Sequence, residues 1–255
     1  MRSRQFHVID GVEVNVYADP QEAGAAAARH AAAAIERAVS MRGKARVIFA
    51  SAPSQLAMLT SLVQQPGIPW KHVEAYHMDE YIGIADDAPQ SFGHWISQQL
   101  APAAVGHLDR IRPGGDPDVE SRRYGALVTA EPVDITCMGI GVNGHIAFNE
   151  PNQCRFDDPE PARVVELTEA SRTQQVDDEC FETIDDVPRT AVTLTVPTLV
   201  RAGTIVMTAS GAHKAAAVKA MLTAPVGSAC PATAIRGRSG ARVFLDEAAG
   251  ALLQE

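Results

Sequence analysis

The sequence predicts an α/β fold built around a mostly parallel, doubly wound sheet with helices on both faces. Three observations support this prediction. Short apolar runs rich in β-branched residues alternate along the chain with longer segments of helical periodicity, a pattern typical of parallel sheets. No internal repeat or linker interrupts the alternation. With 255 residues and 46% hydrophobic composition, the chain is long enough for one sizeable core, so we expect a single domain over residues 1–255.

The first half of the chain predicts three strands and three helices. Residues 12–17 alternate in polarity, whereas residues 46–50 and 72–77 form apolar runs of strand length. Asp19 is expected to cap a long alanine-rich helix over residues 23–42, because a proline and a glutamate follow it at positions that favour a helix start. Apolar residues at helical spacing over 56–63 indicate a second helix, and the acidic pair at 86–87 is expected to open a third that runs to residue 100.

The second half continues the alternation. A helix is expected around residues 124–128 and a buried strand at 133–137. Residues 163–167 look extended, and 191–195, 203–208 and 241–245 are strands enriched in β-branched residues. Further helices are expected at 171–181, 210–221 and 246–253. The whole order is that of a modified Rossmann-like sheet.

Composition and charge exclude several classes of function. The net charge of -9 argues against non-specific binding to nucleic acid or to an acidic membrane, because both need a basic face. The polar N-terminus has no apolar core of a signal peptide, and no apolar run approaches the ~20 residues that span a bilayer. The four cysteines are scattered, without the close pairs of zinc or redox motifs. We therefore expect a soluble, cytoplasmic protein with reduced thiols.

The segment at residues 138–151, MGIGVNGHIAFNEP, is the strongest candidate for a functional site. It follows the expected strand at 133–137, and ligands of open α/β sheets bind at the carboxyl ends of strands. Its glycines permit a sharp exit from the strand, and the exit carries Asn143, His145, Asn149 and Glu150. A glycine-rich loop with a surface histidine is the simpler alternative. The spacing of histidine and glutamate beside glycine turns favours a site.

Three other segments place polar groups at strand ends or helix starts. The turn with Ser51 and Ser54 aims helix amides at a potential phosphate, although either serine can instead be an N-cap. Asp79 follows the third strand together with a second carboxylate, which suggests acid/base chemistry or capping of the next segment. Lys214 lies in the first turn of a helix, where a cation is unfavourable unless it meets an anion or solvent.

With these residues in view, the chain resembles the glucosamine-6-phosphate deaminase/isomerase family, whose fold is shared with 6-phosphogluconolactonases and some sugar-responsive repressor domains. Two motifs carry most of the resemblance, which extends over residues 47–245: HMDEYIG at 77–83 with PQSF at 89–92, and GIGVNGHIAFNEP at 139–151. The second motif is highly specific. Its ending, HIAFNEP, points to the deaminase branch rather than to the lactonases.

The resemblance implies a role for each matching residue. Asp79 would be the base that moves a proton between carbons 2 and 1 of the open-chain sugar, and His145 would open the pyranose ring with Asn143 and Glu150 in support. Many relatives have aspartate where Asn143 stands, which affects the expected pH optimum. The resemblance also implies that Arg172 and Lys214 bind the substrate phosphate. The full set of expected substrate-binding residues is Ser51, Ser54, Gln55, Glu80, Gly144, Arg172 and Lys214.

The segment ASAPSQ at residues 50–55 departs from the family pattern. Relatives usually have a glycine-threonine-rich loop there, whose amides approach the phosphate closely, and the glycine-free loop should reshape that end of the pocket.

The expected reaction needs neither metal nor organic cofactor, because the carbonyl of the substrate is itself the electron sink. The expected partner is a phosphorylated amino sugar, and a homo-oligomer is possible. A galactosamine-6-phosphate deaminase or a 6-phosphogluconolactonase of the same fold is the first alternative. A non-catalytic sugar-phosphate sensor is the second, although such sensors usually carry a helix-turn-helix domain and lack the catalytic residues.

Overall fold

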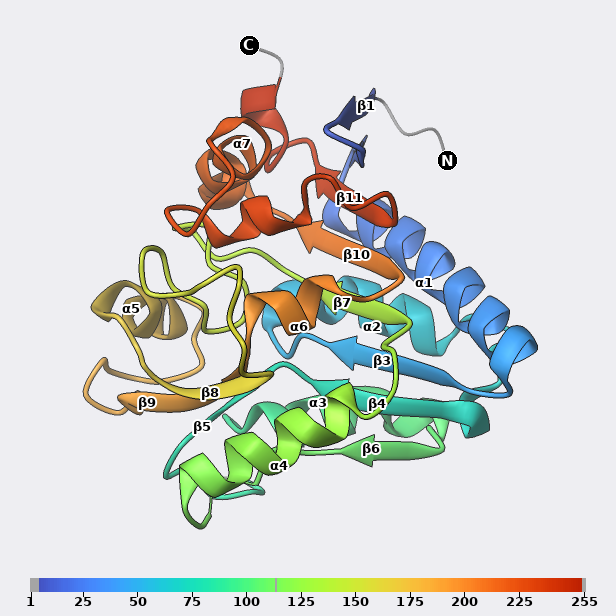
Figure 1. Cartoon of the computed structure of the whole chain (residues 1–255). Helices are drawn as coiled ribbons and strands as arrows, with labels where there is room; N and C mark the ends of the chain where they lie inside the picture. Colours follow the sequence, from blue (N-terminus) through green and yellow to red (C-terminus); the bar gives the residue numbers. More distant parts are fainter. Residues whose placement is uncertain (1–4, 113, 254–255) are drawn as a thin grey trace.

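An eight-stranded sheet forms the centre of the protein, as the computed structural model shows for residues 5–112 and 114–253 (Figure 1). Its spatial order is β1 (Gln5–Ile9), β2 (Val12–Tyr17), β11 (Ala241–Asp246), β10 (Thr204–Ala209), β7 (Ile135–Met138), β3 (Ala45–Phe49), β4 (Val73–His77) and β6 (His107–Asp109). Seven neighbouring strands are parallel, and β1 pairs antiparallel with β2 at one edge. The predicted α/β class with a mostly parallel sheet is confirmed.

Helices cover both faces of this sheet, as predicted. The helices α1 (Pro20–Arg42), α2 (Leu56–Val63) and α3 (Phe92–Leu100) pack on one face, and α4 (Pro117–Thr129), α6 (Val196–Val200) and α7 (Ala215–Thr223) on the other. Side chains alternate across each strand, so Val47 and Phe49 of β3 face the first layer and Ile48 faces the second. All three are fully buried, which explains why the strand reads as a continuous apolar run.

The long helix α1 begins as the sequence predicts. The Asp19 side chain accepts a hydrogen bond from the Glu22 amide at 2.7 Å, and the alanines of the helix lie against the sheet. A Cβ atom at Gly24 would lie 2.7 Å from the backbone of Ala57, so the small residue lets α1 and α2 pack closely. The alanine-rich composition therefore serves close helix packing.

A second, three-stranded antiparallel sheet was not predicted. It consists of β5 (Asp79–Tyr81), β9 (Thr190–Leu194) and β8 (Ala162–Glu166). The sequence did predict β8 and β9, but as strands of the single large sheet, which is wrong. At three residues, β5 is too short for periodicity to reveal it, and it forms because the chain turns after β4 and pairs with β9.

Several predicted helix bounds are also wrong. The helix expected from residue 86 begins at Phe92, because Ser91 caps it by accepting from the amide of His94. The helix α5 covers Glu169–Asp177 and ends before residue 181. The closing helix expected at 246–253 is a turn followed by the short 3-10 helix Ala251–Leu253. The short elements β1, β6 and α6 were not predicted.

The strand order places a switch point between β3 and β7. After β3 the chain adds β4 and β6 on one side, and later it adds β7, β10 and β11 on the other. Ligands of doubly wound sheets bind at the carboxyl ends of the strands beside such a point. In Figure 1 the arrowheads of β3 and β10 point toward α5 and the small sheet, so these elements border the expected binding edge.

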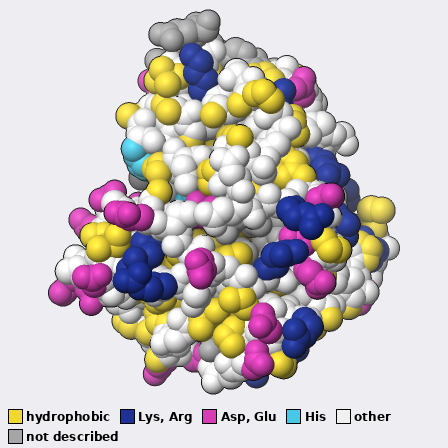
Figure 2. Space-filling model, turned by 60° about the vertical axis from the view of Figure 1, so that its left-hand side comes forward, with side chains coloured by type: hydrophobic (Ala, Val, Ile, Leu, Met, Phe, Trp, Pro, Cys, Tyr) yellow, Lys and Arg dark blue, Asp and Glu magenta, His cyan; other side chains and the backbone are white. Residues whose placement is uncertain are grey.

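The surface and the thiols agree with the composition. Acidic and basic side chains are interspersed on the face shown in Figure 2, without a continuous basic patch there. All four cysteines are free thiols. Within the described ranges, no helix is long and apolar enough to cross a membrane.

Candidate functional site

A pocket opens at the carboxyl ends of β3, β7 and β10, beside the switch point. Its lining comes from the loops after β3 and β7, from β5 and α5, and from the short 3-10 helix that precedes α7. Its lining residues are Ala50, Ser51, Ala52, Pro53, Ser54, Met78, Asp79, Phe92, Gly139, Ile140, Gly141, His145, Ala147, Phe148, Gln174, Gln175, Asp178 and Lys214.

His145 is buried at this pocket and is contacted on two sides. A Cβ atom at Gly141 would lie 2.3 Å from the ring, so the imidazole lies against the glycine backbone. On the other side, the ring Nδ1 is 3.2 Å from the Ser171 hydroxyl and 3.7 Å from the nearer Glu150 oxygen. Burial lowers the pKa of His145, although the Glu150 charge opposes the shift. The ring is therefore neutral near pH 7.

Asn143 and Glu150 contact His145 on the side away from the pocket and do not line the pocket themselves. The Asn143 amide nitrogen donates to Glu150 at 3.0 Å, and its oxygen accepts from the His145 amide at 3.1 Å. The second Glu150 oxygen accepts a short hydrogen bond from Ser171. The predicted triad of Asn143, His145 and Glu150 is thus brought together around the ring.

Asp79 reaches the pocket from the first position of β5. Burial raises the pKa of its carboxyl group to about 8, and the neighbouring Glu80 charge adds to the shift. In the described residues, the carboxyl group makes no hydrogen bond. Such a group is poised to exchange a proton with a ligand close to neutral pH.

Glu80 does not line the pocket, so its predicted contact with substrate is not present. Its carboxylate accepts from the Ser91 hydroxyl at 2.8 Å and from the amides of Phe92 and Gly93 at 3.1 and 2.8 Å. Successive residues of a strand point to opposite sides, so Asp79 and Glu80 cannot both face the same cavity. Glu80 instead caps α3, the alternative that the sequence had left open for this acidic pair.

Lys214 is the cationic side chain that lines the pocket, and Ser51 and Ser54 line it as well. Lys214 lies in the short 3-10 helix Ala212–Lys214 just before α7, and its side chain is buried. Burial lowers the pKa of its ammonium group, and the Asp178 charge opposes the shift. Gln55, which was predicted to bind substrate, does not line the pocket; its buried carboxamide lies beside Gly139, and neither of its polar atoms has a hydrogen-bond partner in the described residues.

Two predicted ligand-binding residues point elsewhere. The Arg172 guanidinium donates to the carbonyls of Ile184 and Val187 and stabilises the segment after α5. Gly144 has a φ of 86° and packs on Cys230, and its carbonyl accepts from the Ala232 amide at 2.9 Å. Neither residue lines the pocket, so the phosphate contact assigned to Arg172 is absent from this conformation.

Sequence reasoning missed the contribution of α5. Ser171, Gln174, Gln175 and Asp178 have the spacing of one helical face, and this face turns toward the pocket and His145. The spacing was visible in the sequence, but it could not show which neighbour that face meets. No group of three or more histidine, cysteine, aspartate or glutamate side chains within the described ranges is arranged to hold a metal ion.

Together, the fold and pocket define an acid/base site for an anionic small molecule. A carboxyl group that titrates near neutrality, a neutral histidine and a buried lysine converge at the switch point of a doubly wound sheet. The chain belongs to the family of glucosamine-6-phosphate isomerases and 6-phosphogluconolactonases, whose family model matches residues 18–244. The resemblance inferred from the two motifs is confirmed.

Similar sequences carry the name of the deaminase. The glucosamine-6-phosphate deaminase of Exiguobacterium sibiricum is 39% identical over 188 residues, which are 72% of each chain. The glucosamine-6-phosphate deaminase of Bacillus cytotoxicus is 32% identical over 87% of this chain and 83% of its own length.

Solved structures show the same fold. A monomeric glucosamine-6-phosphate deaminase has a TM-score of 0.85 at 27% identity and covers 94% of this chain and 99% of its own. The 6-phosphogluconolactonase of Trypanosoma brucei has a TM-score of 0.77 at 18% identity, over 98% of this chain and 100% of its own, which indicates fold alone.

Proposed function

We propose that this protein is a glucosamine-6-phosphate deaminase. It converts glucosamine 6-phosphate and water into fructose 6-phosphate and ammonia. The convergence of Asp79, His145 and Lys214 on one pocket carries the proposal, because the three supply a base, a proton shuttle and an anion partner. Relatives at 30–39% identity bear this name, and a lactonase is not favoured by them.

His145 acts first, on the closed ring of the sugar. Its neutral imidazole takes the proton of the C1 hydroxyl and returns a proton to the ring oxygen, so the bond from C1 to that oxygen breaks and the aldehyde forms. Contact with Gly141 and with Ser171 keeps the ring oriented for both transfers.

Asp79 acts next, on the open chain. It removes the proton from C2, while the C1 carbonyl oxygen accepts the electron pair together with a proton released by the C2 ammonium group, and it then delivers the C2 proton to C1. The carbon bearing nitrogen becomes an iminium, water adds to it, and ammonia leaves. The raised pKa of Asp79 suits a group that must both take and give a proton near neutral pH.

Lys214 binds the phosphate, assisted by Ser51 and Ser54. The phosphate replaces the lost hydration of the buried ammonium, and this favours the protonated form of the lysine. Side-chain hydroxyls take the place of the glycine-rich loop that relatives use, since residues 50–55 contain no glycine.

A panel assay tests the proposal. The purified protein should release ammonia and fructose 6-phosphate from glucosamine 6-phosphate, with less turnover of galactosamine 6-phosphate and none of 6-phosphogluconolactone. Lactone hydrolysis without ammonia release would contradict it, and binding without turnover of any compound would support a sensor instead.

The rest of the proposal concerns setting and assembly. The reaction consumes water and is hydrolytic, and we place the enzyme in the cytoplasm, with residues 1–255 acting as one domain. Its free thiols are compatible with a reducing compartment. Light scattering would distinguish a monomer from a homo-oligomer.

A further inference from the structure

Ser171 occupies a position between His145 and Glu150 that the predicted triad does not explain. Its hydroxyl lies 3.2 Å from the His145 Nδ1 and makes a short hydrogen bond to Glu150, whereas the direct distance from Nδ1 to Glu150 is 3.7 Å. A separation of 3.7 Å is too long for a hydrogen bond. The imidazole and the carboxylate are therefore connected through the serine hydroxyl.

The two hydrogen bonds that join His145, Ser171 and Glu150 can be assigned donors and acceptors in only one way when Glu150 is ionised. An ionised carboxylate only accepts, so the Ser171 hydroxyl donates its proton to Glu150. The Ser171 oxygen then presents lone pairs to His145, and Nδ1 must donate its N–H. The neutral ring consequently carries its proton on Nδ1 and keeps the lone pair of Nε2 free for the pocket.

Ser171 is also excluded from direct chemistry on a substrate. The residue is 1% exposed and does not line the pocket. In a hydrolytic triad the serine precedes the histidine and faces the substrate, whereas here it lies between histidine and carboxylate. Thr168 caps α5 through the Ser171 amide at 3.1 Å, which fixes the helix turn that carries the hydroxyl.

We propose that Ser171 is a positioning residue that sets the His145 tautomer and transmits the Glu150 charge to the ring. When Nε2 takes a proton, the hydroxyl lets Glu150 stabilise the imidazolium. Three charged groups face the ring: Glu150 and Asp178 favour the imidazolium, and Lys214 opposes it. The effect on catalysis rests on the proposed deaminase activity, whereas the tautomer does not.

The proposal is tested by Ser171→Ala, with Ser171→Thr retaining the hydroxyl and Ser121→Ala as the matched control. Ser121 is also a buried helical serine, but its hydroxyl donates to the Asp118 carbonyl at 3.1 Å on α4, away from the pocket. We expect kcat to fall by about 100-fold in Ser171→Ala with a change in KM below about threefold. The kcat of Ser171→Thr should be at least about tenfold higher than that of Ser171→Ala. The kcat of Ser121→Ala should match that of the wild type.

The pH profile gives a second readout. Without the hydroxyl, Glu150 stabilises the imidazolium less, so the histidine limb of the kcat/KM profile should move to lower pH in Ser171→Ala. An unchanged profile together with unchanged kcat would overturn the proposal.

The nitrogen NMR spectrum of His145 separates this proposal from the proposed function. In wild-type protein Nδ1 should be protonated and Nε2 unprotonated, with the signals assigned by their loss in His145→Gln. In Ser171→Ala the two tautomers should mix. A wild-type ring protonated on Nε2 would overturn the proposal even if the enzyme is active, and an inactive protein with the expected tautomers would contradict the deaminase assignment alone.

Discussion

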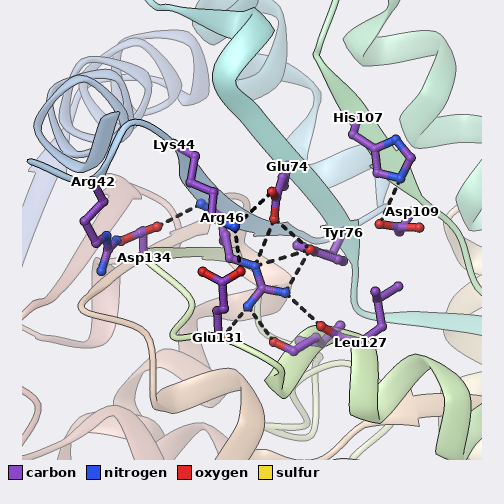
Figure 3. Close-up of polar contacts among 11 residues, drawn as sticks. Arg42, Lys44, Arg46, Glu74, Tyr76, His107, Asp109, Leu127, Glu131 and Asp134 are labelled. Carbon is purple, nitrogen blue, oxygen red and sulfur yellow. Dashed lines mark hydrogen bonds and ion pairs between the residues drawn. The ribbon is translucent and has the colours of Figure 1, made fainter. Parts of the chain in front are cut away.

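The amino ends of the parallel strands, here called the amino edge of the sheet, and their carboxyl ends, called the carboxyl edge, differ in how their buried polar groups are bonded. At the amino edge, Arg46 is 3% exposed and its guanidinium donates to Glu74, to Tyr76, to two carbonyls in the last turn of α4 and to the Glu131 carbonyl just after it (Figure 3). At the carboxyl edge, the Ser51 hydroxyl, the Gln55 carboxamide and the Thr208 hydroxyl are buried without a hydrogen-bond partner in the described residues.

This difference separates stability from function. A fully bonded buried arginine holds α4 against β3 and β4 and offers nothing to a ligand, since each of its nitrogens has an acceptor. Unpartnered polar groups cost stability, and one of the three, the Ser51 hydroxyl, belongs to a residue that lines the pocket, where a ligand can satisfy it. Mutations at the two edges should accordingly affect different measurements.

The largest effect is expected from Asp79→Asn. We expect kcat to fall by about 10³-fold, because the amide cannot take the proton from C2. Turnover is measured by ammonia release, with Asp87→Asn as the control, since Asp87 is an exposed aspartate outside the pocket. A variant that retains a tenth of the wild-type kcat would show that the base lies elsewhere.

The same variant should be more stable than the wild type at alkaline pH. Folding raises the pKa of Asp79 from 3.8 to about 8, so between these values the folded state holds a proton that the unfolded chain has released. The free energy of unfolding of the wild type therefore falls as pH rises through this range, and asparagine removes the fall. At pH 9 the Tm of the variant should be higher by roughly 5–10 °C, and near pH 4 the two should agree.

Arg46→Met tests the amino edge. Removing the guanidinium takes a buried donor away from the carbonyls at the end of α4, whereas the Tyr76 hydroxyl keeps its hydrogen bond to Glu74. We therefore expect a loss of about 3–5 kcal/mol and a fall in Tm of roughly 10 °C. Thermal unfolding measures the loss, with the exposed Arg122→Met on α4 as control. At 20 °C the folded variant should keep its kcat within about twofold, and a tenfold loss would contradict the separation of the two edges.

Gly141→Ala tests the surface that orients His145. The added Cβ would lie 2.3 Å from the ring, so the imidazole must move, and we expect kcat to fall by about 10–100-fold. Gly227→Ala is the matched control, because a Cβ there meets no atom within 4 Å. Equal activity of the two variants would mean that the ring orientation does not limit the rate.

The smallest effect is expected from Glu80→Gln, measured as a pH profile. In the free wild-type enzyme kcat/KM should rise with pH around the Asp79 pKa of about 8. Burial is the larger cause of that shift and the Glu80 charge the second, so the variant should move the midpoint to lower pH by less than about one unit. Glu74→Gln changes the same type of charge at the amino edge and should leave the midpoint in place.

The sequence alone predicted most strands of the large sheet and the grouping of Asn143, His145 and Glu150. Apolar runs and helical spacing are local properties, so they predicted most of the parallel strands and the cap at Asp19. The loop at 139–151 follows its strand directly in the chain, so Asn143, His145 and Glu150 could be grouped by their closeness in sequence. The family followed from the same motifs.

Tertiary structure decided what depends on distant partners. The sequence assigned Glu80 and Arg172 to substrate binding. In the folded protein, Glu80 instead accepts hydrogen bonds from amides at the start of α3, and Arg172 donates to carbonyls after α5. Ser171 belongs to the site only because α5 packs on a loop 26 positions earlier in the chain. Local sequence encodes the tendency of each segment to form a helix or a strand, whereas the direction of a polar side chain is set by the hydrogen-bond partners that folding brings to it.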